Sequence, residues 1–323
     1  MDPWAPSDPL GEALYSVRMD GAFYALSELT APWGVTLPPM EDYVWFHVVT
    51  AGALLLEAGD GGRIEMHRGD LALVPHGTGH VLRSEPGVPA PGILELEREE
   101  VSPRYEIVRH GGGGAYTGLI CGAVRLGHPA ARRLVAALPP VLLLEAEQTL
   151  GTGWMDGTLR LMAAEARELR PGGEAVITRL ADILVIQTLR TWIERDPAAR
   201  QGWLGALRDR HVGRALALMH REPARDWTVD ELADELAMSR SAFAARFTAL
   251  VGEPAMQYLT RWRMHLALDQ LAGGDATVAE LADRLGYRSE AAFARAFKRV
   301  IGSPPGAVRR RGVELGMTLA SAA

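Results

Sequence analysis

The feature of this 323-residue chain that most constrains its fold is a near-repeat toward the C-terminus. Residues 228–236 read TVDELADEL, and residues 277–285 read TVAELADRL. The residues that follow each copy also match in pairs: Phe243 with Phe293, Phe247 with Phe297, Gly252 with Gly302, and Pro254 with Pro304. Two copies of one small unit in a single region predict a domain with two related sites.

Each copy has the pattern of two short helices joined by a tight turn. Thr228 with Glu231, and Thr277 with Glu280, have the spacing of a capping box, which satisfies unpaired N–H groups at a helix start. Gly286 suits the left-handed residue that ends a helix. In each second helix the two phenylalanines are four residues apart, so both rings point into the same core. This is the outline of a helix-turn-helix, whose second helix enters the major groove of DNA.

The helical period of 3.6 residues predicts which side chains point away from that core on each second helix. In the first copy they are Ser241, Ala244, Ala245 and Thr248, with Arg240 and Arg246 on the flanks. In the second copy they are Glu290, Ala291, Ala294, Arg295 and Lys298, with Arg288 at the start and Arg299 nearby. We interpret Arg295 as a base-reading residue, because its guanidinium can bind guanine O6 and N7 together. Ser289, near the helix N-terminus, suits a phosphate contact.

Residues 254–271 form a long helical pattern between the two copies. At about 1.5 Å per residue, such a helix spans roughly 27 Å. This length can hold the two second helices near the roughly 34 Å between successive turns of the major groove. We therefore expect a single chain to contact DNA with both units, although any one exposed arginine can instead be solvated or bound only to phosphate.

Several motifs of this region resemble those of the AraC/XylS transcriptional regulators. They are MSRSAF at 238–243, YLTRWRM at 258–264, GYRSE at 286–290, and FARAFKR at 293–299 followed by GSP at 302–304. The resemblance covers about residues 208–311 and implies two helix-turn-helix units that recognise promoter DNA. It implies base-reading positions at Ser241, Ala244 and Ala245 in the first unit and at Glu290, Ala291 and Arg295 in the second. The alanines depart from the polar residues often found there, and they suit thymine methyl groups better than hydrogen-bonded readout.

The charge distribution agrees with this interpretation. The chain has a net charge of −6, but residues 208–311 hold 17 basic and 13 acidic residues, a net charge of +4 against −10 for the remainder. Only the surface that meets phosphates must be positive in a DNA-binding protein.

The sequence also has no sign of a membrane or secreted location. No apolar run approaches a membrane span, and residues 1–4 lack the basic start of a signal peptide. The one cysteine, Cys121, excludes an intrachain disulfide. These features predict a cytoplasmic protein without a membrane partner.

The N-terminal part, about residues 10–100, has the pattern of β-structure. Turn clusters separate short apolar runs at residues 44–50, 54–57, 64–67 and 71–75. Short strands at this spacing predict a barrel or jelly roll. Gly69, Pro75, Gly77 and His80 fit G-x5-P-x-G-x2-H, which resembles the second motif of the cupins. The first cupin motif is degraded, because Trp45 stands where its glutamate belongs.

Trp45 and His47 are two residues apart on one predicted strand, so both are expected to face the barrel interior. His47 and His80 can then approach each other, and Cys121 can complete a His/Cys site suited to zinc or a similar divalent metal, with His76 as a weaker fourth ligand. The alternative is a pair of hydrogen-bonded histidines that line a dry or ligand-filled barrel, with Cys121 as a small buried side chain. The predicted ligand-pocket residues are Trp45, His47, Val49 and His80.

This part of the chain also resembles the cupin-like sensor domain of AraC-type regulators. The motifs that carry the resemblance are YVWFHVV at 43–49, GDLALVPHG at 69–77, LICG at 119–122, and HP at 128–129 followed by LPP at 138–140. The resemblance covers roughly residues 8–195. It implies a regulatory domain but assigns no effector.

We therefore predict a multidomain protein of α and β structure: an N-terminal cupin-like β-barrel with appended helices, and a C-terminal all-α domain with two helix-turn-helix units. The predicted boundaries are 1–125 for the barrel, 126–196 for a helical extension, 197–207 for a linker, 208–311 for the DNA-binding domain and 312–323 for a tail. Two helical patterns in the extension, 154–169 and 174–194, are expected to pack on the barrel or to offer a dimerisation face.

The predicted function is that of a transcription regulator, not an enzyme, that binds double-stranded promoter DNA as a homodimer and senses an unknown effector. RNA polymerase is a further candidate partner. One alternative is a metal-responsive regulator that uses the His/Cys site. A second is a cupin enzyme fused to a DNA-binding module, against which the missing ligands of the first cupin motif argue.

Overall fold

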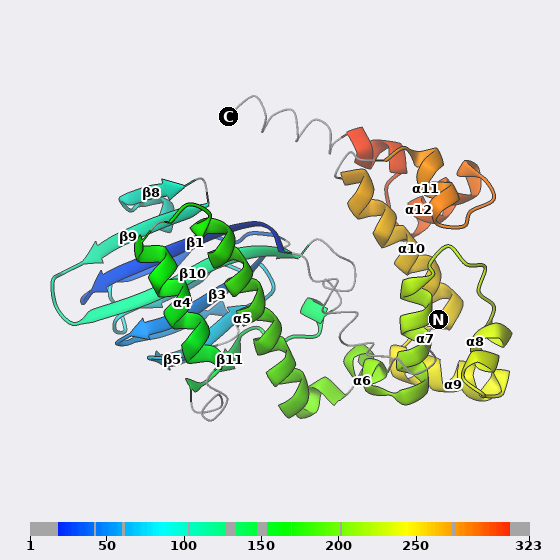
Figure 1. Cartoon of the computed structure of the whole chain (residues 1–323), viewed down its shortest axis with the longest axis horizontal. Helices are drawn as coiled ribbons and strands as arrows, with labels where there is room; N and C mark the ends of the chain where they lie inside the picture. Colours follow the sequence, from blue (N-terminus) through cyan, green and yellow to red (C-terminus); the bar gives the residue numbers. More distant parts are fainter. Residues whose placement is uncertain are drawn as a thin grey trace. The chain divides into compact units, whose positions relative to one another are not determined.

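A computed structural model of the protein describes residues 19–41, 43–59, 62–102, 104–126, 134–146, 154–168, 170–200, 202–272 and 276–310. These residues form two compact units, one that ends at Asp196 and one that begins at Pro197 (Figure 1). We call them the N-terminal unit and the C-terminal unit. Among the residues described, no helix has the length and apolar character needed to cross a membrane.

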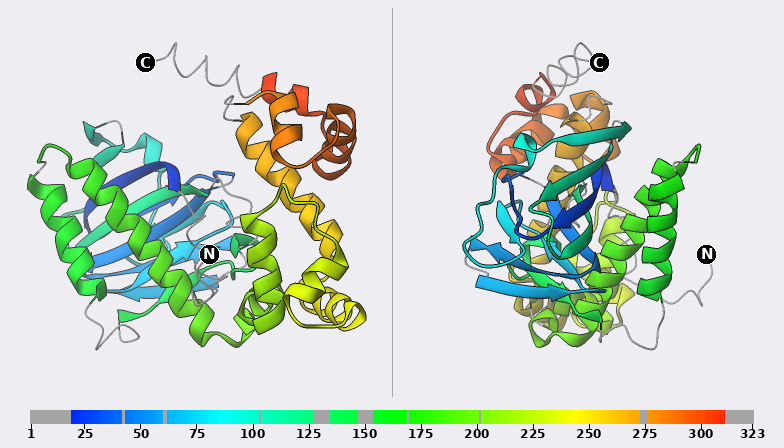
Figure 2. Two further views of the ribbon diagram at one scale, coloured as in Figure 1. Left: turned by 45° about the vertical axis from the view of Figure 1, so that its right-hand side comes forward. Right: turned by 90° about the vertical axis from the view of Figure 1, so that its left-hand side faces the viewer.

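The N-terminal unit contains two β-sheets that share one apolar core (Figure 2). Its strands are β1 (Met19–Thr30), β2 (Gly34–Leu37), β3 (Tyr43–Ala51), β4 (Ala53–Ala58), β5 (Gly62–His67), β6 (Leu71–Val74), β7 (His80–Arg83), β8 (Arg98–Ser102), β9 (Tyr105–Gly111), β10 (Tyr116–Leu126) and β11 (Leu142–Leu144). One sheet has the order β11-β6-β3-β10-β1-β9-β8, and the other has the order β2-β7-β4-β5. The four strands predicted between residues 44 and 75 are confirmed as β3 to β6.

β3 is buried along most of its length because both of its faces are covered. Trp45, His47 and Val49 alternate with Phe46 and Val48, so the first three face the core between the sheets and the other two face the opposite way. Two antiparallel helices, α4 (Trp154–Glu168) and α5 (Gly173–Arg195), lie over the outer face of the seven-stranded sheet (Figures 1 and 2). Both helical patterns predicted in the extension are thus confirmed, and they pack on the sheet.

The last strand of the large sheet comes from the predicted helical extension. β11 pairs antiparallel with β6, with Leu142 opposite Leu73. The sheet therefore continues past residue 125, where the predicted barrel ends. A three-residue strand has too little sequence for a periodic pattern, so only its pairing with β6 identifies it.

The turn of the second cupin-like motif depends on Gly77. This residue has a φ of 61°, and a Cβ at this position would lie 2.2 Å from the carbonyl oxygen of Met40. Glycine alone satisfies both the backbone conformation and the close approach. The turn leads into β7, whose first residue, His80, has its side chain buried in the core.

The C-terminal unit is helical. Its elements are the short helix η3 (Pro197–Arg200), α6 (Gly202–Arg208), α7 (Arg210–Arg221), α8 (Val229–Glu235), α9 (Arg240–Val251), α10 (Ala255–Ala272), α11 (Val278–Arg284) and α12 (Glu290–Ile301). The long helix predicted at 254–271 is confirmed as α10.

The predicted linker at 197–207 differs from the structure. Leu204, Ala206 and Leu207 of α6 are buried where α6 packs on α7 and α9. These residues are part of the folded C-terminal unit.

The two copies of the repeat form the same local structure twice. Thr228 and Thr277 each accept a hydrogen bond from the backbone three residues later, and Glu231 and Glu280 each return one, which confirms both capping boxes. The caps of the second helices repeat as well: Ser239 and Gly252 for α9, and Ser289 and Gly302 for α12.

The turn after each first helix is a Schellman motif. In the first copy, the N–H of Ala237 donates to the Asp234 carbonyl at 3.0 Å and that of Met238 donates to the Ala233 carbonyl at 2.9 Å. The second copy has Gly286 where the first has Ala237, and φ is 75° at the glycine and 52° at the alanine. Among the described residues other than glycine, Ala237 is the one with a positive φ. Its side chain therefore carries a steric cost that glycine avoids.

We expect Ala237→Gly to raise the free energy of unfolding of the C-terminal unit by up to about 1 kcal/mol, because glycine adopts this left-handed conformation without strain. Calorimetric unfolding of the full chain measures the change. Gly252→Ala is the reverse control, since Gly252 has a φ of 83° and open space around its Cβ position, and it should lower the stability by a similar amount. A loss of stability in Ala237→Gly would show that the alanine is not strained.

Candidate nucleic-acid interface and barrel interior

The exposed face of α9 is set by two phenylalanines on its opposite side. Phe243 and Phe247 are fully buried and meet edge to face, with ring centroids 5.7 Å apart. Ser241 and Ala245 are exposed, as the helical period predicts, but Ala244 is half-buried. The candidate contact face of α9 therefore presents small side chains.

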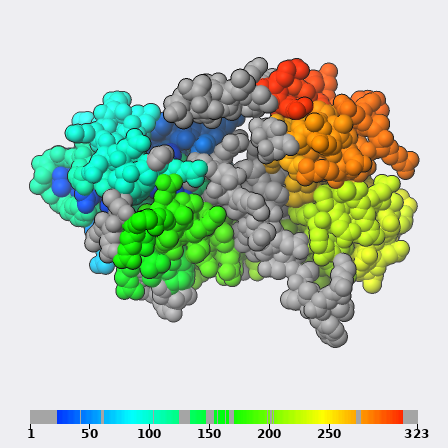
Figure 3. Space-filling model, turned by 45° about the horizontal axis from the view of Figure 1, so that its top comes forward, coloured from blue at the N-terminus to red at the C-terminus, as the bar shows by residue number. Residues whose placement is uncertain are grey.

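α12 repeats this geometry with a more cationic surface. Phe293 and Phe297 are fully buried. The exposed residues of the helix include Glu290, Ala291, Arg295, Lys298 and Arg299. Within the described part of the chain, Arg295 makes no hydrogen bond or ion pair, so its guanidinium is available to a ligand. Both repeat copies lie at the surface of the C-terminal unit, the first coloured yellow and the second orange in Figure 3.

The two arginines that flank α9 are held differently. Arg246 contacts both carboxylate oxygens of Asp209 at 2.5–3.1 Å, and Asp209 also accepts hydrogen bonds from the first N–H groups of α7. The Arg246 guanidinium holds the pKa of Asp209 below its ordinary value. Arg240 pairs with Asp230 at 3.0 Å, but both side chains are more than half exposed, so this pair opens easily. Arg246, predicted as a DNA contact, therefore fastens α9 to α7.

Ser289, predicted as a phosphate contact, is the N-cap of α12. Its Oγ accepts a hydrogen bond from the Ala292 N–H at 3.2 Å, and Ser239 has the same position in α9. The hydroxyl hydrogen of Ser289 can still be donated to a phosphate. The adjacent Arg288 is almost fully exposed and lies 3.9 Å from an equally exposed Asp226, so this ion pair is weak.

In the barrel interior, Cys121, His47 and His80 form one hydrogen-bonded chain. Cys121 on β10 lies opposite His47 on β3, and the Nδ1 atom of His47 is 3.1 Å from the sulfur. The Nε2 atom of His47 is 2.6 Å from the Nε2 atom of His80, so one of these nitrogens carries a hydrogen and the other accepts it. The three residues that the sequence places in the interior thus come together.

Their geometry does not form the predicted metal site. His47 turns one ring nitrogen toward Cys121 and the other toward His80, and the two nitrogens of one imidazole cannot bind the same ion. In the described ranges, no three His, Cys, Asp or Glu side chains are placed to hold a metal ion. His76, the weaker candidate ligand, is exposed, and its Nε2 lies 3.0 Å from the carbonyl oxygen of Leu138. The alternative of hydrogen-bonded histidines is the one that fits this geometry.

Burial keeps the three groups uncharged at neutral pH. It lowers the pKa of His47 well below its ordinary value, lowers that of His80 to about 4, and raises that of the Cys121 thiol to about 12. Trp45 stacks along His47 and meets His80 edge-on, with centroid distances of 6.3 and 5.8 Å. Val49 belongs to the same core. The predicted pocket residues thus share one interior, and ligand binding there stays a prediction.

Sequence reasoning missed a cavity in the N-terminal unit, between β8–β9 and the connection from α4 to α5. Its volume is about 170 Å³, and its polar lining comes from Ser102, Tyr105, Glu165, Arg170 and Glu174. Typical small-molecule sites have roughly 300 Å³ or more, so this cavity is small. Its walls come from segments far apart in the chain, and no local pattern marks them.

A family model described as a cupin matches residues 8–194, and one described as a helix-turn-helix domain matches residues 232–311. A putative AraC-like transcription regulator of Streptomyces lividans is 37% identical over 94% of this chain and 98% of its own length. One of Streptomyces antibioticus is 35% identical with the same coverage. Among solved structures, the DNA-binding domain of AdpA in complex with a target DNA is 33% identical, covering 31% of this chain and 89% of that chain with a TM-score of 0.30.

We expect Arg246→Ala to lower the free energy of unfolding at pH 7 by more than the matched change at Arg240 does, because it removes a two-pronged charge-assisted contact from the mostly enclosed carboxylate of Asp209. The matched change Arg240→Ala should cost less than about 0.5 kcal/mol. The paired Asp209 has a lowered pKa, so its contribution is present above the ordinary value of 3.8 and is lost as the pH falls below it. Urea unfolding measures both variants, and equal costs would contradict these assignments.

Proposed function

Because this chain belongs to the AraC-like transcription regulators and carries an N-terminal cupin domain, we propose that it recognises promoter DNA sequence-specifically with α9 and α12 together. The observation that carries this proposal is the duplicated helix pair. The same caps, the same Schellman turn and the same buried phenylalanine pair leave one face of each second helix exposed. A helix exposed in this way is the element that enters the major groove in helix-turn-helix proteins.

In this proposal the two helices read DNA by different chemistry. Arg295 of α12 binds a guanine edge through its guanidinium, which has no partner among the described residues, while Lys298 and Arg299 meet the phosphates beside it. On α9, Ser241 and Ala245 are small, so the helix can approach the groove closely and contact thymine methyl groups. Hydrogen-bonded readout is thereby concentrated on α12.

We expect Arg295→Ala to weaken binding to a duplex that the wild-type protein selects from a random pool by about 1–3 kcal/mol, and to relax the preference at one base pair. Lys298→Ala, on the same helix, should weaken selected and random duplexes equally and reduce the salt dependence by about one phosphate contact. Fluorescence anisotropy over a series of salt concentrations measures both variants. Equal losses on both duplexes for Arg295→Ala would place its guanidinium on a phosphate.

We also propose that the N-terminal unit senses an effector and biases DNA binding by a shift of population. An effector acts only through a difference in its affinity for two states of the protein. The support for this role is Nδ1 of His80, which is buried beside an apolar core, has no hydrogen-bond partner among the described residues, and can therefore orient a polar ligand. The relatives are transcription regulators, which favours sensing over catalysis in this domain.

We further propose that α4 and α5 join two copies of the chain. Five large apolar side chains among the described residues are more than a third exposed, and three of them, Leu161, Val176 and Ile183, lie on this helix pair. Val176 and Ile183 are seven residues apart, so they share one stripe of α5. An exposed apolar stripe on a helix can serve as a protein contact, and a second copy supplies the identical apolar face that a two-fold interface requires.

We expect the wild-type protein to sediment as a dimer and Ile183→Glu to sediment as a monomer, because an unpaired carboxylate inside an apolar interface is costly to bury. Leu94→Glu is the matched control, since Leu94 is also exposed but lies outside the helix pair, and this variant should stay dimeric. Sedimentation velocity measures all three proteins. A monomeric wild type, or a dimeric Ile183→Glu variant, would contradict the proposed interface.

A further inference from the structure

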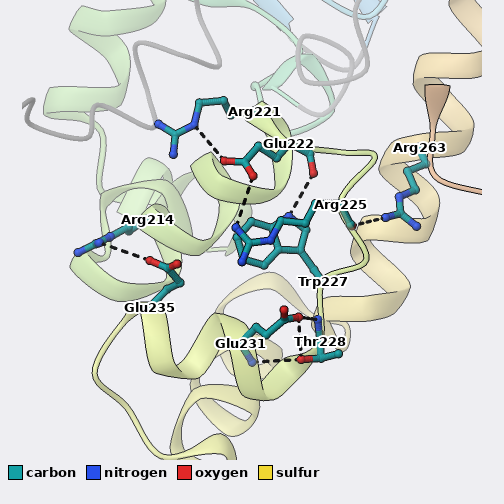
Figure 4. A network of polar contacts seen from close by, with 9 residues as sticks. All are labelled: Arg214, Arg221, Glu222, Arg225, Trp227, Thr228, Glu231, Glu235 and Arg263. Carbon is teal, nitrogen blue, oxygen red and sulfur yellow. Dashed lines mark hydrogen bonds and ion pairs between the residues drawn. The ribbon is translucent and has the colours of Figure 1, made fainter. Parts of the chain in front are cut away.

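The connection between α7 and α8, residues 222–227, is braced by its own side chains, and we call it the bracket loop (Figure 4). The buried Trp227 donates from Nε1 to the carbonyl oxygen of Glu222 at 3.1 Å. The Arg225 guanidinium lies over the Trp227 ring, 3.7 Å from its centroid, and pairs with the Glu222 carboxylate at 3.4 Å. These contacts hold the loop in one shape, so it can serve as a rigid surface for its neighbours.

Arg263 of α10 fastens the bracket loop to the long helix. Its Nε donates to the carbonyl oxygen of Pro223. Its second terminal nitrogen donates to the carbonyl oxygen of Arg225 at 2.7 Å (Figure 4). The same guanidinium lies 5.9 Å from the centroid of the Tyr287 ring, which belongs to the turn of the second repeat copy. Arg263 therefore contacts both the loop that leads into the first copy and the turn of the second.

Gly286, in that same turn, lies against the backbone of the bracket loop. A Cβ at this position would be 2.0 Å from the carbonyl oxygen of Ala224 and 2.9 Å from its carbonyl carbon. The equivalent residue of the first copy, Ala237, has the same left-handed conformation and carries a Cβ. The turn itself thus tolerates alanine, and the contact with Ala224 is what requires glycine in the second copy.

The bracket loop adds a second contact to the one that α10 already provides. The first copy packs on α10 through Phe247 and Tyr258, whose ring centroids are 5.8 Å apart. The second copy packs on the same helix through Phe293, Met264 and Leu271. Contacts with one helix alone would allow the second copy to rotate about the axis of α10. A separate contact at the bracket loop removes that freedom.

We propose that the bracket loop, Arg263 and Gly286 hold the two helix-turn-helix units at one separation and orientation, and so determine the spacing between the two DNA elements that α9 and α12 read together. This inference rests on the proposed function, in which both helices contact DNA. One added base pair moves the second element by about 3.4 Å and rotates it by roughly 35°. A rigid pair of units then loses the contacts of one helix, whereas a loosened pair follows the shifted element. Arg263 and Gly286 are positioning residues in this role.

The experiment uses the full chain and a duplex that the wild-type protein selects from a random pool, together with duplexes that differ by one or two base pairs between the two elements. The variants are Gly286→Ala and Arg263→Lys. The added Cβ of the first would separate the turn of the second copy from the bracket loop, and the second lacks the two guanidinium donors that bind the loop. Gly302→Ala is the matched control, because Gly302 has a φ of 84° and nothing within 4 Å of its Cβ position. A duplex with a single element reports whether each variant still binds.

We expect the wild type and Gly302→Ala to lose affinity on the order of tenfold or more for one added base pair. Gly286→Ala and Arg263→Lys should lose about threefold or less in affinity for one added base pair, or should bind most tightly at a neighbouring spacing. Both variants should still bind the single-element duplex. A wild type without sequence preference would overturn the proposed function itself. This inference alone would be overturned by a wild type that binds every spacing equally well. It would also be overturned if Gly286→Ala and Arg263→Lys bind the single element and lose as much affinity for one added base pair as the wild type does.

Discussion

Each second helix can bury only one of its faces, and a pair of phenylalanines four residues apart decides which face that is. With both pairs fully buried, the rotation of α9 and of α12 about their axes is fixed, and the opposite side chains are left to solvent or DNA. The serine caps and left-handed glycines then determine where each helix begins and ends. The two copies therefore have the same local structure. They differ in their exposed side chains, which are small on α9 and mostly cationic on α12.

A related constraint governs the barrel, where polar groups inside an apolar core must find partners. His47 and Cys121 belong to neighbouring strands of the seven-stranded sheet, while His80 begins β7 of the other sheet. The hydrogen bond between the two imidazoles therefore joins the two sheets across the core. Because both ring nitrogens of His47 are used in this chain, the same arrangement cannot gather the three side chains around one metal ion, and among the described residues Nδ1 of His80 is left buried without a hydrogen-bond partner.

The capping boxes, the buried phenylalanines and the long α10 could be predicted because each depends on residues close together in the chain. Strand alternation likewise predicted that His47 faces the interior, but not which nitrogen faces which neighbour, since that depends on side-chain rotation. The role of Arg246 was missed because its partner, Asp209, is 37 residues away. The sequence 197–207 resembled a linker because proline and glycine flank a helix too short to show a period, and only packing on α7 and α9 reveals α6.

Differences between the two copies of the repeat are as informative as the identities. Ala237 and Gly286 end equivalent helices with equivalent hydrogen bonds, so local structure alone would allow the same residue at both positions. They differ because the Ala224 carbonyl lies against one turn. The same reasoning applies to the exposed faces, where identical frames carry an arginine in one copy and alanine in the other. At these positions the two copies differ in sequence because one of them makes a tertiary contact or faces a ligand. A sequence difference between the copies therefore marks such a position before the contact itself is known.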